Sequence, residues 1–238
     1  MLTQQARYDD AIATYGYIQD RWPEDPENAT YQYTVARLYA MMPVPDPEEV
    51  NRALMVLNER YSDRTPWAEA NRANPDALDT ARKYIEESLA AVATNFHISA
   101  QATGNQAHYA KAAELYQQYL DKFPFANDYY EIENNLADVY FATGQLAEAE
   151  TTYEQLLKAG QHEFRENALW RVMQTRRQLL IDKYGKVETL PADAAEEKRV
   201  TLASGKERVI YKLSADHAEF IDVCDLAAWM IGLLELLR

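Results

Sequence analysis

The sequence predicts an all-α fold built from antiparallel helix pairs, and three observations support this expectation. Glycine is scarce, at 7 of 238 residues, while alanine, leucine, glutamate and glutamine are abundant, a composition that favours helix. Asx–proline pairs, which are typical of helix starts, recur along the chain. The pattern of residues 8–23 returns at residues 109–124, as expected of a protein made of repeated helical units.

Helical periodicity divides the chain into segments separated by short breaks. The expected helices cover residues 2–21, 26–42, 47–61, 75–103, 106–122, 127–143, 146–159, 162–184 and 215–238, and a short helical turn fits 66–72. Asp25-Pro26, Asp46-Pro47 and Asn74-Pro75 are the expected starts of three of them. The Asx side chain accepts a first-turn N–H there, and proline lacks an N–H that would have no partner. In the longer connection at 62–74, we expect Trp67 to be a packing anchor.

One stretch, residues 187–214, departs from the helical pattern. It contains Pro191 and two β-rich runs, "RVTL" and "RVIYKL", on either side of Ser204-Gly205, a pair that suits a turn. A small β-hairpin and an irregular loop both fit this pattern. We therefore expect helical repeats at 1–184, an insertion at 185–214 and a terminal helix at 215–238 that packs on the repeats. Because the helical pattern runs to the last residue, we expect the chain to be a fragment of a longer protein.

The repeated block has identical or similar residues at matching positions. The matching pairs are Tyr8 and Tyr109, Ala11 and Ala112, Tyr15 and Tyr116, Asp20 and Asp121, Arg21 and Lys122, Trp22 and Phe123, Pro23 and Pro124, Ala36 and Ala137, and Tyr39 and Tyr140. Every pair is 101 positions apart. This offset is close to three units of about 34 residues, the period of one class of helix–turn–helix repeat.

A further copy of the pattern, at residues 136–157, indicates the repeat type. Its pattern residues are Leu136, Ala137, Tyr140, Gly144, Ala149, Tyr153 and Leu156. This arrangement resembles the tetratricopeptide repeat, in which small residues let helices A and B approach closely and a glycine permits the positive φ of the turn between them. The resemblance covers most of residues 2–184 and implies a right-handed superhelix of helix pairs. The sequence departs from the family pattern at Glu133, where tryptophan is common, and at Gln161, where proline is common.

The resemblance also suggests where such a protein works. Proteins of this family are generally interaction scaffolds, so we expect a non-enzymatic scaffold within a larger assembly, or an assembly factor that binds one client peptide. More weakly, the alternation of regular repeats and irregular linkers resembles large envelope-associated tetratricopeptide proteins of gliding and predatory bacteria. The chain as given shows no signal peptide and does not fix the location: we expect the bacterial cell envelope or periplasm if a leader has been removed, and otherwise the cytoplasm.

The acidic charge argues against nucleic acids and anionic lipids as partners, and the cysteine content argues against a disulfide. The chain has 38 acidic and 24 basic residues, for a net charge of −14. Nucleic acids and anionic lipid surfaces need clustered cations, so neither is expected to bind, whereas a basic protein segment would be attracted. The single cysteine, Cys224, cannot form an intrachain disulfide, and we expect it to be a small core residue. No stretch is long and apolar enough to insert into a membrane. The sequence does not indicate an oligomeric state.

No catalytic or metal-binding motif stands out. The histidines, His97, His108, His162 and His217, lack metal-ligand spacing, so we expect no metal and no cofactor. We expect His97 to be a hydrogen-bonded or half-exposed helix residue and not a ligand. Adjacent acids such as Glu86-Glu87 point about 100° apart on a helix and do not converge on a substrate. The alternative of another class is a helical-toroid hydrolase, which would bring two acids together from different helices.

A polar stripe on the helix at 127–143 is the best candidate for a binding surface. In the tetratricopeptide family the A helices line the concave face, which receives peptides. The register that makes Leu136 and Ala137 packing residues directs neighbouring polar residues toward that face. The candidate peptide-binding residues are Glu131, Asn134, Asn135, Asp138, Tyr130, Tyr33 and Arg37. Glu131 stands where the family's peptide-carboxylate clamp has a lysine, so the expected partner is basic or neutral. A merely solvated helix face is the competing interpretation.

Overall fold

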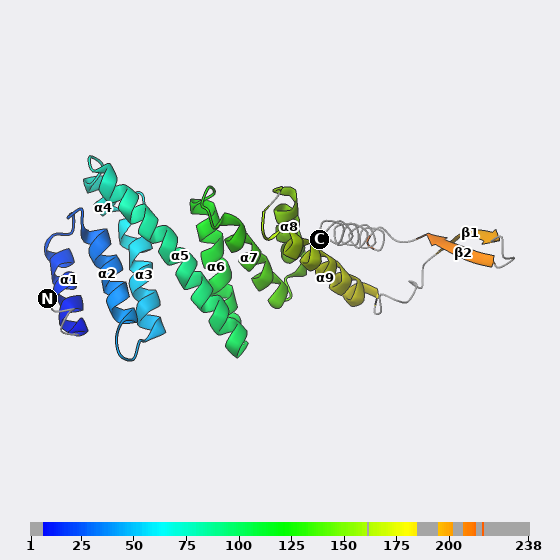
Figure 1. The fold of residues 1–238 in the computed structure, drawn as a ribbon, viewed down its shortest axis with the longest axis horizontal. Helices are drawn as coiled ribbons and strands as arrows, with labels where there is room; N and C mark the ends of the chain where they lie inside the picture. The colour runs from blue at the N-terminus through cyan, green and yellow to red at the C-terminus, as the bar shows by residue number, and fades with distance from the viewer. Residues whose placement is uncertain (1–6, 161, 185–194, 202–206, 213–215, 217–238) are drawn as a thin grey trace, which may run out of the picture. The chain divides into compact units, whose positions relative to one another are not determined.

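A computed structural model describes residues 7–160, 162–184, 195–201, 207–212 and 216. Within these residues the chain is almost entirely helical (Figure 1). The helices are α1 (Tyr8–Arg21), α2 (Asn28–Ala40), α3 (Pro47–Tyr61), α4 (Pro66–Ala70), α5 (Pro75–Thr103), α6 (Gln106–Lys122), α7 (Tyr129–Ala142), α8 (Leu146–Lys158) and α9 (Arg165–Tyr184). Two strands follow, β1 (Ala195–Thr201) and β2 (Glu207–Lys212). The all-α repeat fold is therefore confirmed.

The chain forms two compact parts, residues 1–132 and 133–238, whose boundary lies inside α7. In the first part the helices pack in chain order: α2 contacts α1 and α3, α5 contacts α3 and α6, and α2 also contacts α5 (Figure 1). The helices thus form the pairs α2–α3 and α5–α6, and α1 precedes the first pair and packs against α2. In the second part, α8 packs against α9.

Small residues are buried in the helices that pack together, as the repeat pattern predicts. The fully buried alanines of the first part include Ala29 and Ala36 on α2, Ala81 and Ala93 on α5, and Ala112 on α6. In the second part Ala137, Ala149 and Tyr153 are buried. Gly144 joins α7 to α8 with a φ of +77°, which a glycine adopts without steric cost. The predicted roles of these residues are thereby confirmed.

Side-chain caps fix several helix starts. Asp46 accepts a hydrogen bond from the Glu48 N–H at 2.9 Å, and Asn74 accepts one from the Ala77 N–H at 3.3 Å, as predicted. The prediction for Asp25 was wrong. Its carboxylate accepts from the Glu27 N–H at 2.9 Å within a turn, so α2 begins only at Asn28. The first expected helix likewise begins at Tyr8 within the described residues.

The irregular connection between α3 and α5 is held in place by Trp67, as predicted. The Trp67 indole N–H donates to the Asp25 carbonyl at 2.8 Å, and its ring meets Tyr61 edge-on at a centroid distance of 5.2 Å. Asn71, which is also buried, donates to the Glu24 carbonyl at 3.0 Å. These contacts tie the short helix α4 to the loop between α1 and α2.

The described part of the insertion consists of two paired strands, which fits the predicted β-hairpin and not the irregular loop. Strands β1 and β2 pair antiparallel, with Ala195 opposite Lys212 and Thr201 opposite Glu207, and the register shifts by one residue between Glu196 and Lys198. The expected turn at Ser204-Gly205 lies outside the described residues, as do the terminal helix beyond residue 216 and Cys224.

Replacing Ala149 by leucine tests the repeat register. Ala149 is fully buried on α8, so we expect Ala149→Leu to lower the free energy of unfolding by about 1–3 kcal/mol through overpacking. Ala147→Leu is the matched control, because Ala147 is exposed on the same helix. Both can be measured by chemical denaturation followed by circular dichroism. Equal stability of the two variants would show that Ala149 does not lie in a close helix contact.

Candidate functional site

The seven candidate residues fall into two separate groups. Tyr33, Arg37, Tyr130 and Glu131 belong to the first part of the chain, and Asn134, Asn135 and Asp138 to the second. Tyr33 and Arg37 on α2 occupy the positions that correspond to Asn134 and Asp138 on α7, since the two helices are offset by 101 residues. The two groups are therefore built from the same helix positions of the repeat.

In the first part, Tyr33 lies at the contact between α2 and α5. Its ring stacks on that of Tyr84 at a centroid distance of 4.2 Å and an interplanar angle of 7°. Its hydroxyl donates to the Glu87 carboxylate at 2.9 Å. Burial and this carboxylate raise the pKa of Tyr33. Arg37 is exposed one turn further along α2 and lies close enough to act electrostatically on Tyr33. We call Tyr33, Arg37, Tyr84 and Glu87 the α2–α5 patch.

In the second part, Asp138 is bonded within the protein. Its carboxylate accepts from the Tyr153 hydroxyl at 2.5 Å and from the Asn134 amide at 3.3 Å, and it lies 3.0 Å from Nε of Arg171 on α9. Burial, followed by this carboxylate, raises the pKa of Tyr153. Asp138 thus joins helices α7, α8 and α9, a role that its neighbours along the sequence do not reveal.

Asn134 takes part in the same network. Its side chain is only 5% exposed, and its carbonyl oxygen accepts from the Asn167 amide of α9 at 2.9 Å. Asn135 is half-buried beside it. Two residues of the predicted polar stripe, Asn134 and Asp138, are therefore engaged by α9. Asn167 and Arg171 were not among the candidates, because only the packing of α9 on this face shows their role.

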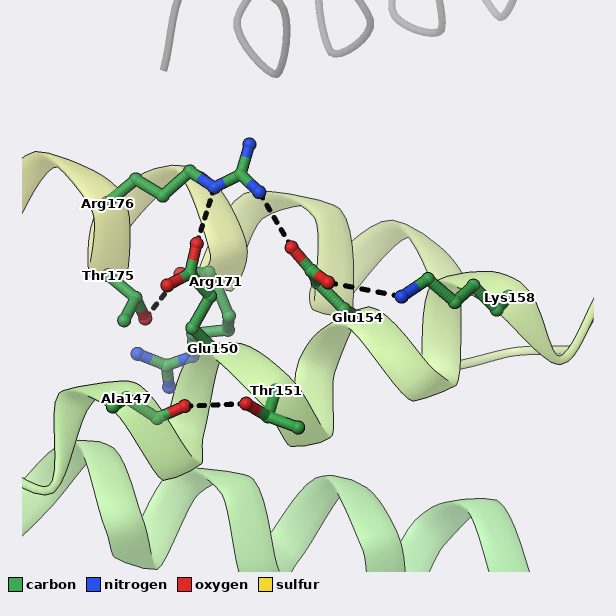
Figure 2. A network of polar contacts seen from close by, with 8 residues as sticks. All are labelled: Ala147, Glu150, Thr151, Glu154, Lys158, Arg171, Thr175 and Arg176. Carbon is green, nitrogen blue, oxygen red and sulfur yellow. Dashed lines mark hydrogen bonds and ion pairs between the residues drawn. The ribbon is translucent and has the colours of Figure 1, made fainter. Parts of the chain in front are cut away.

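A second polar network joins α8 and α9 (Figure 2). Arg176 of α9 donates to Glu150 and to Glu154, each at 2.6 Å, and Lys158 pairs with Glu154 at 3.2 Å. Figure 2 shows the Arg176 guanidinium between the two carboxylates. The Arg176 side chain is mostly buried, so its pairs are less screened by salt than surface pairs. The carboxylates of Glu150 and Glu154 are therefore paired with cations of the same chain.

Glu133 differs from every other carboxylate in the described residues by being buried and raised in pKa. It is 7% exposed, and burial raises its pKa to about 7. It stands at the position where the family often has tryptophan, which is the signal that could have indicated its burial. It does not share a site with another acid, and the described residues contain no group of histidine, cysteine or acidic side chains suited to a metal ion.

His97 has the structural role that was predicted. It is buried between α5 and α6, where its ring nitrogens lie 3.3 Å from the Tyr116 hydroxyl and 3.1 Å from the Gln101 amide nitrogen. Its ring also meets that of Tyr116 edge-on. Both ring nitrogens therefore have polar partners within the helix pair.

Removing the Asp138 carboxylate tests whether this residue is structural or available to a partner. Asp138→Ala leaves Tyr153 and Arg171 without their acceptor, so we expect a loss of about 1–3 kcal/mol in the free energy of unfolding. Asp182→Ala is the control, because Asp182 is exposed and, among the described residues, accepts a hydrogen bond from Gln178 alone. If Asp138→Ala leaves thermal and urea stability unchanged, Asp138 is not structural and stays a candidate for binding a partner.

Short antiparallel helix pairs, small residues at the crossings and glycine at the tight turn define a helical-repeat protein. Residues 106–170, from α6 into α9, match the family model of the tetratricopeptide repeat, and this part of the chain has the repeat. No curated protein matches the chain. Proteins with this repeat generally mediate protein–protein interactions and are generally not enzymes. None of the helices described is both long and apolar enough to cross a membrane.

Proposed function

We propose that the chain is a non-enzymatic scaffold of a larger assembly and that it contacts another protein through the α2–α5 patch. The observation that supports this most directly is the rigid arrangement of Tyr33, Tyr84 and Glu87, with the exposed Arg37 beside them. A stacked and hydrogen-bonded tyrosine loses little conformational freedom on binding, and Tyr and Arg are the residues that most often dominate protein interfaces.

The patch is also better placed for binding than the corresponding positions of the second part. Asn134 and Asp138 are engaged by α9, whereas Arg37 makes no ion pair with any residue in 7–132 that the structure describes. Glu131 is exposed and Tyr130 half-buried at the start of α7, and both remain candidate binding residues. A partner with both carboxylate and cationic or neutral groups would complement Arg37 and Glu87.

Purification of the full-length protein from its own organism tests this function. The double variant Tyr33→Ser, Arg37→Ser removes the patch, and Arg52→Ser, at an exposed arginine of α3, is the control. We expect at least one protein that co-purifies in stoichiometric amount with the wild type and the control to be lost from the double variant. Retention of all partners by the folded double variant would rule out the patch as their binding surface.

A further inference from the structure

The second part of the chain has a hollow beside the C-terminal half of α9. Its volume is about 520 Å³, and it is lined by Glu150 of α8, by residues of α9 and by Asp216. Leu180 is buried at 2% exposure and Leu179 is half-buried, so apolar side chains form part of its wall. The hollow thus offers apolar surface that a further element could bury. The α9 residues that line it are Arg176, Leu179, Leu180, Asp182 and Lys183.

The internal repeat shows which residues of the first part correspond to this wall. Asn167 of α9 contacts Asn134, and Tyr84 of α5 contacts Tyr33. Because residues 33 and 134 are matching positions of the repeat, Asn167 corresponds to Tyr84, an offset of 83 positions from 84 to 167. Burial supports this match: Ile85, Leu89, Val92 and His97 of α5 are all buried, and so are their counterparts Ala168, Val172, Thr175 and Leu180.

In the first part, the corresponding side of α5 is covered by α6. The His97 ring meets the Tyr116 ring of α6 edge-on. Phe96 and Ser99 both contact His108 of α6, the phenyl ring at a centroid distance of 5.4 Å and the hydroxyl oxygen at 2.8 Å from Nδ1. The hollow therefore lies on the side of α9 where the second helix of a pair would pack. The counterparts of Phe96, His97 and Ser99 are the wall residues Leu179, Leu180 and Asp182.

The chain has a segment whose start lies at this hollow. Asp216 lines the hollow, and its carboxylate accepts a hydrogen bond from the Lys183 ammonium at 2.5 Å. The 22 residues at 217–238 would span about 33 Å as a helix, a length comparable with that of the 20-residue helix α9. Their sequence has apolar residues three or four positions apart, as on one face of a helix, namely Ile221, Cys224, Ala228 and Ile231.

We propose that residues 217–238 fill this hollow as a helix that packs along α9 and completes a helix pair with it. The small residues Cys224 and Ala228 would lie at the contact, as the buried Ala112 does in α6. The hairpin of β1 and β2 is then an insertion between the two helices of one pair. The inference goes beyond the proposed scaffold function and is independent of it, since that function concerns the α2–α5 patch.

The single cysteine of the chain reports on this packing. Cys224 of the complete chain is reacted with an aromatic disulfide that releases a coloured thiolate. We expect the reaction to be at least about tenfold slower in the native protein than in urea, and Leu179→Asp to accelerate it by about fivefold or more. Val44→Asp, at a residue that is 86% exposed in the first part, is the control and should leave the rate unchanged. Equal rates in native and unfolded protein, or in Leu179→Asp and wild type, would overturn the inference.

Disulfide formation tests the same packing without a change to the hollow's leucines. If both helices run antiparallel from the Lys183–Asp216 pair, Cys224 lies close to the height of Met173 on α9. We therefore expect Met173→Cys, oxidised at low protein concentration, to form a disulfide with Cys224 within one chain, since this bond needs Cα atoms within about 7 Å. Gln178→Cys, on a different side of α9, is the control and should form none.

Non-reducing electrophoresis separates the outcomes. A disulfide within one chain from Met173→Cys alone supports the inference. A disulfide that joins two chains would show that a second copy fills the hollow, and no disulfide would show that residues 217–238 do not pack there. Either of these results contradicts the inference and leaves the scaffold function untouched.

Discussion

Trp67→Ala is expected to lower the free energy of unfolding of the first part by about 3–5 kcal/mol, the range for removing a large buried aromatic side chain. Trp67 is 4% exposed, and the variant loses its edge-on contact with Tyr61 and its hydrogen bond to the Asp25 carbonyl. Because α4 is only five residues long, it has few other contacts that could hold the connection at 62–74. Urea denaturation followed by circular dichroism measures the loss.

Trp22→Ala is the matched control for this variant. Trp22 is 52% exposed in the same part of the chain, so its removal should cost less than about 1 kcal/mol. Similar losses in the two variants would show that the connection is not anchored by Trp67 and that α4 is held by other residues.

Glu133→Gln is expected to stabilise the protein above neutral pH and to have little effect in mild acid. Burial raises the pKa of Glu133 from an ordinary value of 4.5 to about 7. Between these values the folded state binds more protons than the unfolded state, so the wild type loses stability as the pH rises from about 4.5 to 7. The loss amounts to about 3 kcal/mol at pH 8, since each pKa unit corresponds to about 1.4 kcal/mol.

The measurement is the free energy of unfolding of wild type and Glu133→Gln at several pH values from 4.5 to 8. The gap between the two proteins should widen with pH and become constant above about pH 8. Glu163→Gln, at an exposed residue, should follow the wild type throughout. A gap that stays constant from pH 4.5 to 8 would show that Glu133 is ionised in the folded protein at an ordinary pKa.

Much of the fold could be predicted because its determinants are local. Helices α3, α5 and α6 begin and end at the predicted residues, since Asp46-Pro47, Asn74-Pro75 and the Gly104-Asn105 pair are start and stop signals that lie within the sequence itself. The same logic failed at Asp25. An Asx residue before a proline can form a turn as readily as a cap, and the sequence around Asp25 does not decide between them.

The candidate site was harder to predict from the sequence, because its properties arise from helices that are distant in the sequence. The repeat register correctly identified Leu136 and Ala137 as packing residues, but Asn134, which it directed toward the concave face, is buried as well. It could not show that Asn167 and Arg171 of α9 engage Asn134 and Asp138. Nor could it show that Tyr84 stacks on Tyr33.

Site-specific photo-crosslinking in the native organism tests the central claim, that the α2–α5 patch contacts another protein, most directly. A photoreactive amino acid is placed at position 37 in the patch or at position 52 on α3, two exposed arginines of the same part. The account predicts a discrete adduct between the chain and a second protein from position 37 and none from position 52. No adduct from position 37, or the same adduct from both positions, would contradict it.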